Sequence, residues 1–345
     1  MITRKGKYTL LLNDKVNVIG FSAVASKKEF EGPLGSDFDK IFHDPKAGMT
    51  TWEQAESAFV KEAVSTALTK AHLKGEDIDY IFAGDLLNQC ISSSYGLMAF
   101  SIPYLGQYGA CSTMAQSLIM AAITLESNAA SYCAAASSSH FCAAERQYRF
   151  PLEYGGQRTP TAQWTVTAAG CCILAKEKHV FPSVNAITVG RIKDSGITDA
   201  NNMGAAMAPA AAATIIDYFS DTGRNPTEFD AIFTGDLGAV GSQLLYKLTE
   251  EAGINIKDRH KDCGLMIYDR QKQDVHAGGS GCGCAASVLC SHILPKLQQK
   301  EYTNILFTAT GALMSPTACQ QGQSIPSIAH LVELSAPSVS KNTLK

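Results

Sequence analysis

Cys111 is the residue of this sequence that is best placed to do chemistry. It follows an apolar stretch, residues 102–109, that predicts a strand, and it precedes a small-residue stretch that predicts a helix over about residues 112–125. The start of a helix offers free backbone amides and a positive partial charge, which favour a thiolate and can hold an anion. The same pattern also suits a small core residue at the start of an alanine-rich helix. The sequence therefore predicts either a reactive thiol or a core cysteine here.

A repeated segment indicates which elements position Cys111. Residues 81–86 read IFAGDL, and residues 232–237 read IFTGDL. Each copy is followed, in the same order, by a helix, a strand, a glycine-rich bend, a long small-residue helix and a buried strand. The closing strands, residues 130–136 and 304–309, are apolar throughout, as expected for strands that helices cover on both faces.

The two repeats divide the chain into halves. Apolar residues at helical spacing precede each copy, over about residues 55–68 and 210–219. In the second half, a glycine-rich bend leads to a helix over about residues 285–297. We therefore expect an α/β protein in α-β-α-β-α layers, built from two pseudo-symmetric βαβ-type halves, residues 1–178 and residues 179–345.

The composition limits the classes of function. The 345 residues carry 29 Lys and Arg against 32 Asp and Glu, a net charge of −3, so no overall positive charge favours nucleic acid. Several of the eleven cysteines lie in apolar runs, which indicates free thiols in a reducing compartment. The start of the chain does not read as a signal peptide, and no run reaches the roughly 20 apolar residues of a membrane-spanning helix. We expect a protein of the cytoplasmic side whose membrane role is peripheral or through a partner.

The repeated halves and three short motifs resemble the thiolase superfamily. The motifs are the turn around Cys111 (residues 109–113, GACST), the strand at residues 167–171 (TAAGC) and the glycine loop at residues 281–287. The resemblance spans about residues 16–331. It implies a thiolase-like fold, with Cys111 at the position of the acyl-accepting cysteine in the family's condensing enzymes.

The partners of that cysteine in the family are missing at the matching positions. The resemblance places Asp236 or Gly235 where the family has a histidine, and Cys282 or Ser280 where it has a second partner, Asn or His. In the family these partners form the oxyanion site and move protons, and a carboxylate would oppose a developing enolate. We therefore expect no condensation and no catalytic residue.

Six further segments narrow the resemblance. They are residues 32–35 (GPLG), 83–89 (AGDLLNQ), 143–147 (AAERQ), 153–157 (EYGGQ), 196–199 (GITD) and 324–326 (SIP). Their order and spacing resemble the stage V sporulation AD family of spore-forming bacteria. That resemblance implies a non-catalytic protein that binds dipicolinic acid (pyridine-2,6-dicarboxylate), free or as its calcium complex, for uptake into developing spores. It also implies membrane proteins of the SpoVA complex as partners, and peripheral association with the forespore or spore inner membrane.

A planar dianion of this kind needs cationic or amide donors for two carboxylates and a flat apolar slot for its ring. The candidate slot residues are Met203, Met207 and Tyr148. The candidate ligand-binding residues are Cys111, Asp85, Asn88, His140, Arg146, Arg191, Lys193, Asp236, Cys282 and His330. Asp85, Asn88 and Asp236 follow predicted strands, where capping of the next helix is the alternative role. We expect no cofactor and no bound metal.

Three other functions stay open. The first is an acyltransferase or thioesterase that uses acyl thioesters, with Cys111 as nucleophile and His140 or His330 as base. The second is a zinc protein, whose Cys-Gly-Cys spacing suits zinc poorly; its ligands would be Cys263, Cys282, Cys284 and either His260 or His276. The third is a structural subunit that tethers other proteins. Thiolase relatives pair through the strand that matches residues 130–136. This resemblance predicts a homodimer, and a monomer within a larger assembly is the alternative.

Overall fold

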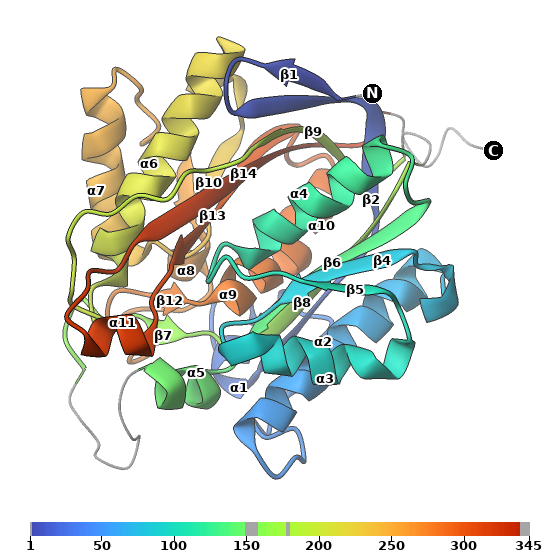
Figure 1. Cartoon of the computed structure of the whole chain (residues 1–345), viewed down its shortest axis with the longest axis horizontal. Coiled ribbons are helices and arrows are strands. Elements are labelled where there is room, and N and C mark those ends of the chain that lie inside the picture. The colour runs from blue at the N-terminus through green and yellow to red at the C-terminus, as the bar shows by residue number, and fades with distance from the viewer. Residues whose placement is uncertain (1, 149–157, 177–179, 339–345) are drawn as a thin grey trace.

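The computed structural model describes residues 2–148, 158–176 and 180–338. Helices and sheets alternate in layers (Figure 1). Helices α2 (Trp52–Ala71) and α3 (Ile91–Leu97) pack together outside the first-half sheet, and α6 (Met203–Thr222) and α7 (Gly238–Glu251) pack together outside the second-half sheet. The layer between the sheets contains α4 (Thr113–Glu126), followed by α9 (Cys282–Val288), a π-helix (Leu289–Ile293) and α10 (Leu294–Gln298). The predicted layered α/β fold is confirmed.

The strand order confirms that the two halves repeat one topology. The first-half strands, in sheet order, are β5 (Tyr104–Gly106), β4 (Tyr80–Gly84), β6 (Tyr132–Ser139), β8 (Ala168–Ala175) and β2 (Thr9–Ser26). The second-half strands, in the matching order, are β11 (His260–Asp262), β10 (Ala231–Thr234), β13 (Asn304–Ala312), β14 (Ser327–Ser335) and β9 (Ser183–Thr188). In each half the first two pairings are parallel and the last two are antiparallel.

One long strand joins the two sheets. The first part of β2, from Thr9, pairs with β9, and its second part, up to Ala25, pairs with β8. Short elements complete the fold: α5 (Phe141–Tyr148) and α11 (Pro316–Gln320) occupy matching positions in the two halves, and the others are β1 (Thr3–Lys5), α1 (Lys27–Phe30), β3 (Lys40–Phe42), β7 (Trp164–Thr165), α8 (Cys263–Met266) and β12 (Gly279–Ser280). The predicted boundary between residues 178 and 179 lies outside the described residues.

Several predicted elements have different bounds in the structure. The strand expected over residues 102–109 is only β5, because the chain leaves the sheet to turn toward Cys111. The helix expected over residues 210–219 begins at Met203, and the helix expected from residue 285 begins at Cys282. Met203 and Met207 therefore lie in the first turns of α6.

The prediction that two copies of the chain pair through residues 130–136 is wrong. Residues 130–136 belong largely to β6, which lies between β4 and β8 and has no free edge for another chain. The end strand of the first-half sheet is β5, which pairs with β4 on one side. A homodimer stays a prediction. The unpaired edge of β5 is a place where a second copy could add its own strand to this sheet.

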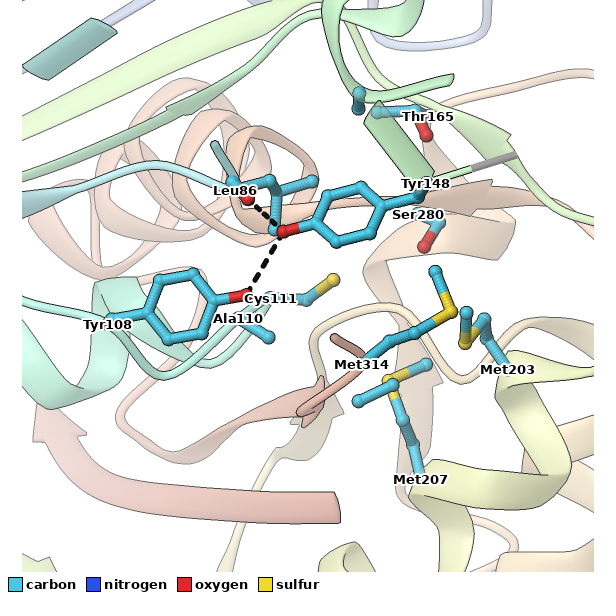
Figure 2. Close-up of a pocket in the computed structure, with 12 residues that line it drawn as sticks. Leu86, Tyr108, Ala110, Cys111, Tyr148, Thr165, Met203, Met207, Ser280 and Met314 are labelled. Carbon is cyan, nitrogen blue, oxygen red and sulfur yellow. Dashed lines mark hydrogen bonds between the residues drawn. The ribbon is translucent and has the colours of Figure 1, made fainter. Parts of the chain in front are cut away.

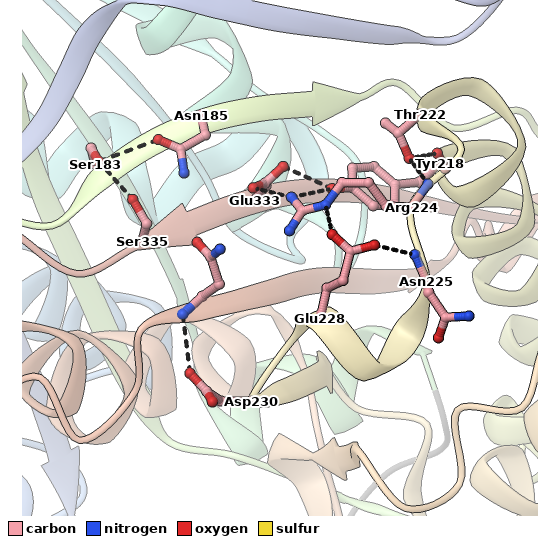
Figure 3. Close-up of polar contacts among 11 residues, drawn as sticks. Ser183, Asn185, Tyr218, Thr222, Arg224, Asn225, Glu228, Asp230, Glu333 and Ser335 are labelled. Carbon is pink, nitrogen blue, oxygen red and sulfur yellow. Dashed lines mark hydrogen bonds and ion pairs between the residues drawn. The ribbon is translucent and has the colours of Figure 1, made fainter.

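A buried ion pair fastens the end of α6 to β14 (Figure 3). Arg224 Nη1 donates to Glu333 Oε1 at 2.7 Å, and Tyr218 Oη donates to Glu333 Oε2 at 2.7 Å. Arg224 Nε also donates to Glu228 Oε2 at 2.9 Å. Because Glu333 is buried, these charge-assisted hydrogen bonds satisfy a carboxylate that would otherwise be costly to bury.

Within the described residues, no helix has both the length and the apolar character that crossing a membrane requires.

Candidate functional site

A tight turn presents Cys111 at the start of α4. Ala110 has a left-handed backbone, with φ +49°, which is unusual for a residue other than glycine. The amides of Ser112 and Thr113 donate to the carbonyl oxygens of Gly109 and Ala110 at 3.0 and 3.2 Å. The expectation that the helix start offers free amides to an anion is therefore wrong for these two groups, because the turn itself uses them.

Asp236 is the centre of the polar contacts around Cys111. The Cys111 thiol lies close enough to the fully buried Asp236 carboxylate for that charge to oppose its ionisation. Three groups donate hydrogen bonds to this carboxylate: Thr310 Oγ1 at 2.7 Å, Ser280 Oγ at 3.0 Å and the Gly281 amide at 2.8 Å. Gly281 has φ +105°, a conformation that essentially only glycine adopts, so the glycine loop is shaped to aim this amide at Asp236.

These contacts keep Cys111 in its neutral form. Burial raises the pKa of the Cys111 thiol well above its usual range, and the charge of Asp236 raises it further. Burial also raises the pKa of Asp236, against the hydrogen bonds from Gly281 and Thr310 that lower it. At neutral pH Cys111 is a thiol, whereas nucleophilic attack requires the thiolate.

The two copies of the Gly-Asp-Leu motif have different roles. Asp85 accepts hydrogen bonds from the amides of Leu87 and Ser93 at 2.9 and 2.7 Å, and so caps the start of α3. Asp236 instead faces the glycine loop, and the start of α7 is capped by Asp262, which accepts from the Leu237 and Gly238 amides. The repeat has therefore kept a structural aspartate in one half and a site aspartate in the other.

A narrow pocket of about 40 Å³ opens beside Cys111 (Figure 2). Its lining comes from both halves and is mostly apolar: Leu86, Tyr108, Ala110, Cys111, Ala144, Tyr148, Thr165, Met203, Met207, Ser280, Ala312 and Met314. Tyr148 Oη donates to the carbonyl oxygen of Leu86, and the Tyr108 and Tyr148 hydroxyls are 3.1 Å apart. The three predicted slot residues, Met203, Met207 and Tyr148, all line this pocket.

Cys282 lies next to the pocket without lining it. Its thiol donates to the Ser138 carbonyl oxygen at 2.8 Å. Burial raises the pKa of Cys282 well above its usual range, and the neighbouring Cys111 raises it further. The structure therefore brings together three of the predicted site residues, Cys111, Asp236 and Cys282.

The predicted cations lie elsewhere. Arg146 pairs with Glu53 and, with Asn88, lines a separate groove between α2, α3 and α5. Arg191 pairs with Asp217 at 2.7 Å and lies over the ring of Tyr8, and the backbone of Lys193 bridges to Ser327. In the described part of the chain, the pocket lining contains no Lys, Arg or His.

Neither candidate base reaches the pocket. His140 Nε2 is 2.9 Å from the Pro45 carbonyl oxygen, and the ring packs against Trp52. His330 Nδ1 accepts from the Gly190 amide at 3.2 Å, on β14. Both side chains are satisfied core histidines, and burial lowers the pKa of each, to about 4 for His330.

His330→Asn should make the protein less sensitive to acid, because Asn Oδ1 can accept from Gly190 without carrying a titratable proton. In the unfolded chain His330 takes up a proton below its ordinary pKa of about 6.5, but the folded protein resists this until about pH 4. Stability that is present above pH 6.5 is therefore lost as the pH falls toward 4, by at most about 3 kcal/mol from this residue. Urea unfolding at pH 7 and pH 4.5 measures the difference, and equal losses in both proteins would contradict the assignment.

The zinc alternative has no support in the described residues. Cys263, Cys282 and Cys284 are buried free thiols, and His260 is bound between Tyr246 and Thr234 at 2.9 and 2.8 Å. His276 contacts Asp274 and the Thr159 carbonyl oxygen. No group of three or more such side chains in the described ranges could hold one ion.

Several residues that line the pocket were not predicted. Tyr108 lies directly before the motif around Cys111, and Leu86 ends the first repeat, so the sequence contained a signal for both. Ala312 is the last residue of β13 and Met314 follows the strand, and only the matching position of the two halves could have placed them beside Cys111.

Comparison with solved structures defines the class of fold. The chain is similar to 3-oxoacyl-[acyl-carrier-protein] synthase III from Aquifex aeolicus VF5, with a TM-score of 0.57, 14% identity, and coverage of 93% of this chain and 99% of that one. It is also similar to acetamide-bound OleA from Xanthomonas campestris, with a TM-score of 0.61, 14% identity, and coverage of 94% and 99%. At these identities the likeness establishes the fold alone, and it is the thiolase fold.

Sequence comparison gives the family. The model of the stage V sporulation protein AD family matches residues 6–335. Stage V sporulation protein AD of Bacillus subtilis (strain 168) is 42% identical over 325 residues, which are 94% of this chain and 96% of that protein. The chain belongs to the stage V sporulation protein AD family.

Proposed function

We propose that this chain is a non-catalytic sporulation protein that binds dipicolinic acid in the pocket beside Cys111 and serves its uptake into the developing spore. The observation that carries the proposal is that Cys111, at the nucleophile position of the thiolase fold, lines the pocket as a buried thiol beside the buried Asp236 carboxylate. In its neutral form Cys111 is part of the pocket wall and not a nucleophile.

The pocket lining suits a planar aromatic ring with polar groups at its edge. Met203, Met207 and Met314 offer polarizable, adaptable side chains that make favourable contacts with ring edges and faces. The hydroxyls of Tyr108, Tyr148 and Ser280 line the pocket, and each would have to exchange its present hydrogen bond, to Tyr148, Leu86 or Asp236, in order to donate to a carboxylate oxygen. Since the volume is about 40 Å³, the flexible methionines must shift to admit the ligand.

The negative charge of Asp236 affects which form of the ligand the pocket can hold. Asp236 disfavours an uncompensated dianion, and a calcium ion carried by the ligand would offset its two negative charges. The free acid and its calcium complex are therefore both included in the proposal. Membrane proteins of the SpoVA complex are the proposed partners, with the chain peripheral to the spore inner membrane; the family membership supports this part.

An acyltransferase or thioesterase with Cys111 as nucleophile is the second candidate, and the fold of its enzyme neighbours is what favours it. It needs a thiolate at Cys111 and a base within reach. Among the described residues, the group beside Cys111 is the Asp236 carboxylate, whose charge raises the pKa of the thiol, and no histidine lines the pocket. Incubation with acetyl-CoA followed by intact mass should give no acetyl adduct on Cys111, and a stable adduct would support the enzyme.

Met203→Trp should weaken dipicolinate binding by about ten-fold or more, because the indole fills the slot. Isothermal titration calorimetry on the wild type should give a dissociation constant in the micromolar range or weaker, with a measurable heat of binding.

Met98→Trp is the matched control, because Met98 is 73% exposed and does not line the pocket. It should bind like the wild type. Equal binding by Met203→Trp and Met98→Trp would place the ligand elsewhere, and no binding by the wild type would favour a purely structural subunit.

A further inference from the structure

Two thiols from opposite halves of the chain face each other in the core, away from the pocket. Cys172 on β8 and Cys290 on the π-helix have their sulfurs 3.6 Å apart, and their exposed fractions are 0% and 1%. Both are free cysteines, and Cys290 Sγ also lies 3.5 Å from the Cys171 carbonyl oxygen. Neither thiol contributes to the site around Cys111.

The local sequence explains why Cys290 points at β8. Pro295 follows on α10 and has no amide to donate to the helix, so the regular hydrogen-bond ladder cannot continue through it. The backbone instead forms the π-helix, in which the Leu294 amide donates to the Leu289 carbonyl oxygen. The wider turn rotates the side chains of this segment, and Cys290 is the one that meets Cys172.

We propose that Cys172 and Cys290 are an oxidation site at which a disulfide forms between the two halves. The oxidant is a small peroxide, which is close to water in size. One thiolate attacks a peroxide oxygen, which gives a sulfenic acid and one water; the second thiol then displaces the hydroxyl from that sulfur, which gives the disulfide and a second water. The two cysteines together lose two hydrogens and two electrons, and the peroxide is reduced.

The geometry requires a modest movement. The sulfurs must approach from 3.6 Å to about 2.05 Å. A small shift of the π-helix, which is an irregular segment between two α-helices, would bring the sulfurs together. Burial, with Cys290 beside it, raises the pKa of Cys172 well above its usual range, so the reaction should be slow and selective for small oxidants.

The disulfide would link β8 covalently to the helices between the two sheets. It would close a loop of 118 residues between β8 and the middle helices, and so restrict the unfolded chain. Oxidised protein should therefore melt several degrees higher than reduced protein. Cys290 lies on the helical segment that follows the glycine loop, so the disulfide would also restrict the motion of the elements that hold Gly281.

The full-length reduced protein, treated with hydrogen peroxide and digested without reductant, tests the proposal. We expect a peptide pair that joins Cys172 to Cys290 and separates on reduction. Cys290→Ala should lose the cross-link and the rise in melting temperature, and Cys171→Ala should keep both. If a variant does not fold, the peptide map of the wild type decides alone.

Two results would overturn the proposal. One is that Cys172 and Cys290 are both still alkylated after unfolding while other cysteines have been oxidised. The other is that the wild type cross-links Cys111 to Cys282 instead, since these two thiols are also neighbours.

Discussion

Replacing Asp236 by asparagine is expected to make Cys111 react with iodoacetamide at least about ten-fold faster at pH 8. The charge of the carboxylate opposes the thiolate. A neutral amide removes the charge. With its oxygen in the Oδ2 position it can still accept from Ser280 and the Gly281 amide, and its NH2 group can donate to Thr310 Oγ1, which preserves the fold of the glycine loop. One opposing interaction of about 1.4 kcal/mol corresponds to the ten-fold change. Peptide mass spectrometry after timed alkylation resolves Cys111 from the other cysteines.

Asp85→Asn is the matched control, because it changes the aspartate at the matching position of the repeated hexapeptide in the other half. Asp85 is bound to the Leu87 and Ser93 amides and does not contact Cys111. Its substitution should lower stability through the helix cap and leave the alkylation rate of Cys111 unchanged. If both variants react like the wild type, Asp236 is not what holds Cys111 in its neutral form, and the main support for a non-catalytic role is lost.

The comparison of these two aspartates also shows what local sequence can predict. The repeat predicted where the strands end, because buried strands read as apolar runs in both halves and the motif marks their last residues. The role of each aspartate could not be read in the same way. Asp85 accepts from amides within eight positions along the chain, whereas Asp236 accepts from Ser280, which is 44 positions away. The two aspartates have the same neighbours along the chain but different partners in space.

The contacts of the charged candidates were not predicted. Arg146, Arg191 and Lys193 were expected to bind the ligand, yet Arg146 and Arg191 pair with acidic side chains instead. Such pairings depend on packing between distant elements: Glu53 is on α2 and Arg146 is on α5. Two of the apolar slot residues, Met203 and Met207, were predicted although the helix that carries them was expected only from about residue 210; they are one helical turn apart on α6 and so face the same side.

Gly84→Ala is expected to destabilise the protein by about 3 kcal/mol or more. A Cβ on Gly84 would lie 1.8 Å from the carbonyl oxygen of Gln107, which is backbone and cannot move aside alone. Gln107 follows β5, and its amide donates to the Ala83 carbonyl oxygen, so relief of the clash would break the sheet at this point. Because Gln107 leads to Tyr108 and Cys111, the pocket should also be distorted. Chemical denaturation measures the loss, and dipicolinate calorimetry measures the effect on the pocket.

The second half supplies the control for this prediction. Gly235 occupies the matching position in the repeat, but its Cβ would find its nearest atom at 3.2 Å, so its neighbours need to give way by only a few tenths of an ångström. Gly235→Ala should therefore cost less than about 1 kcal/mol. Similar losses in the two variants would mean that the close approach of β4 to Gln107 is not a constraint on the fold. A large difference would show that the two halves share a topology but not the tightness of packing at the ends of their strands, which is where the first half turns toward Cys111.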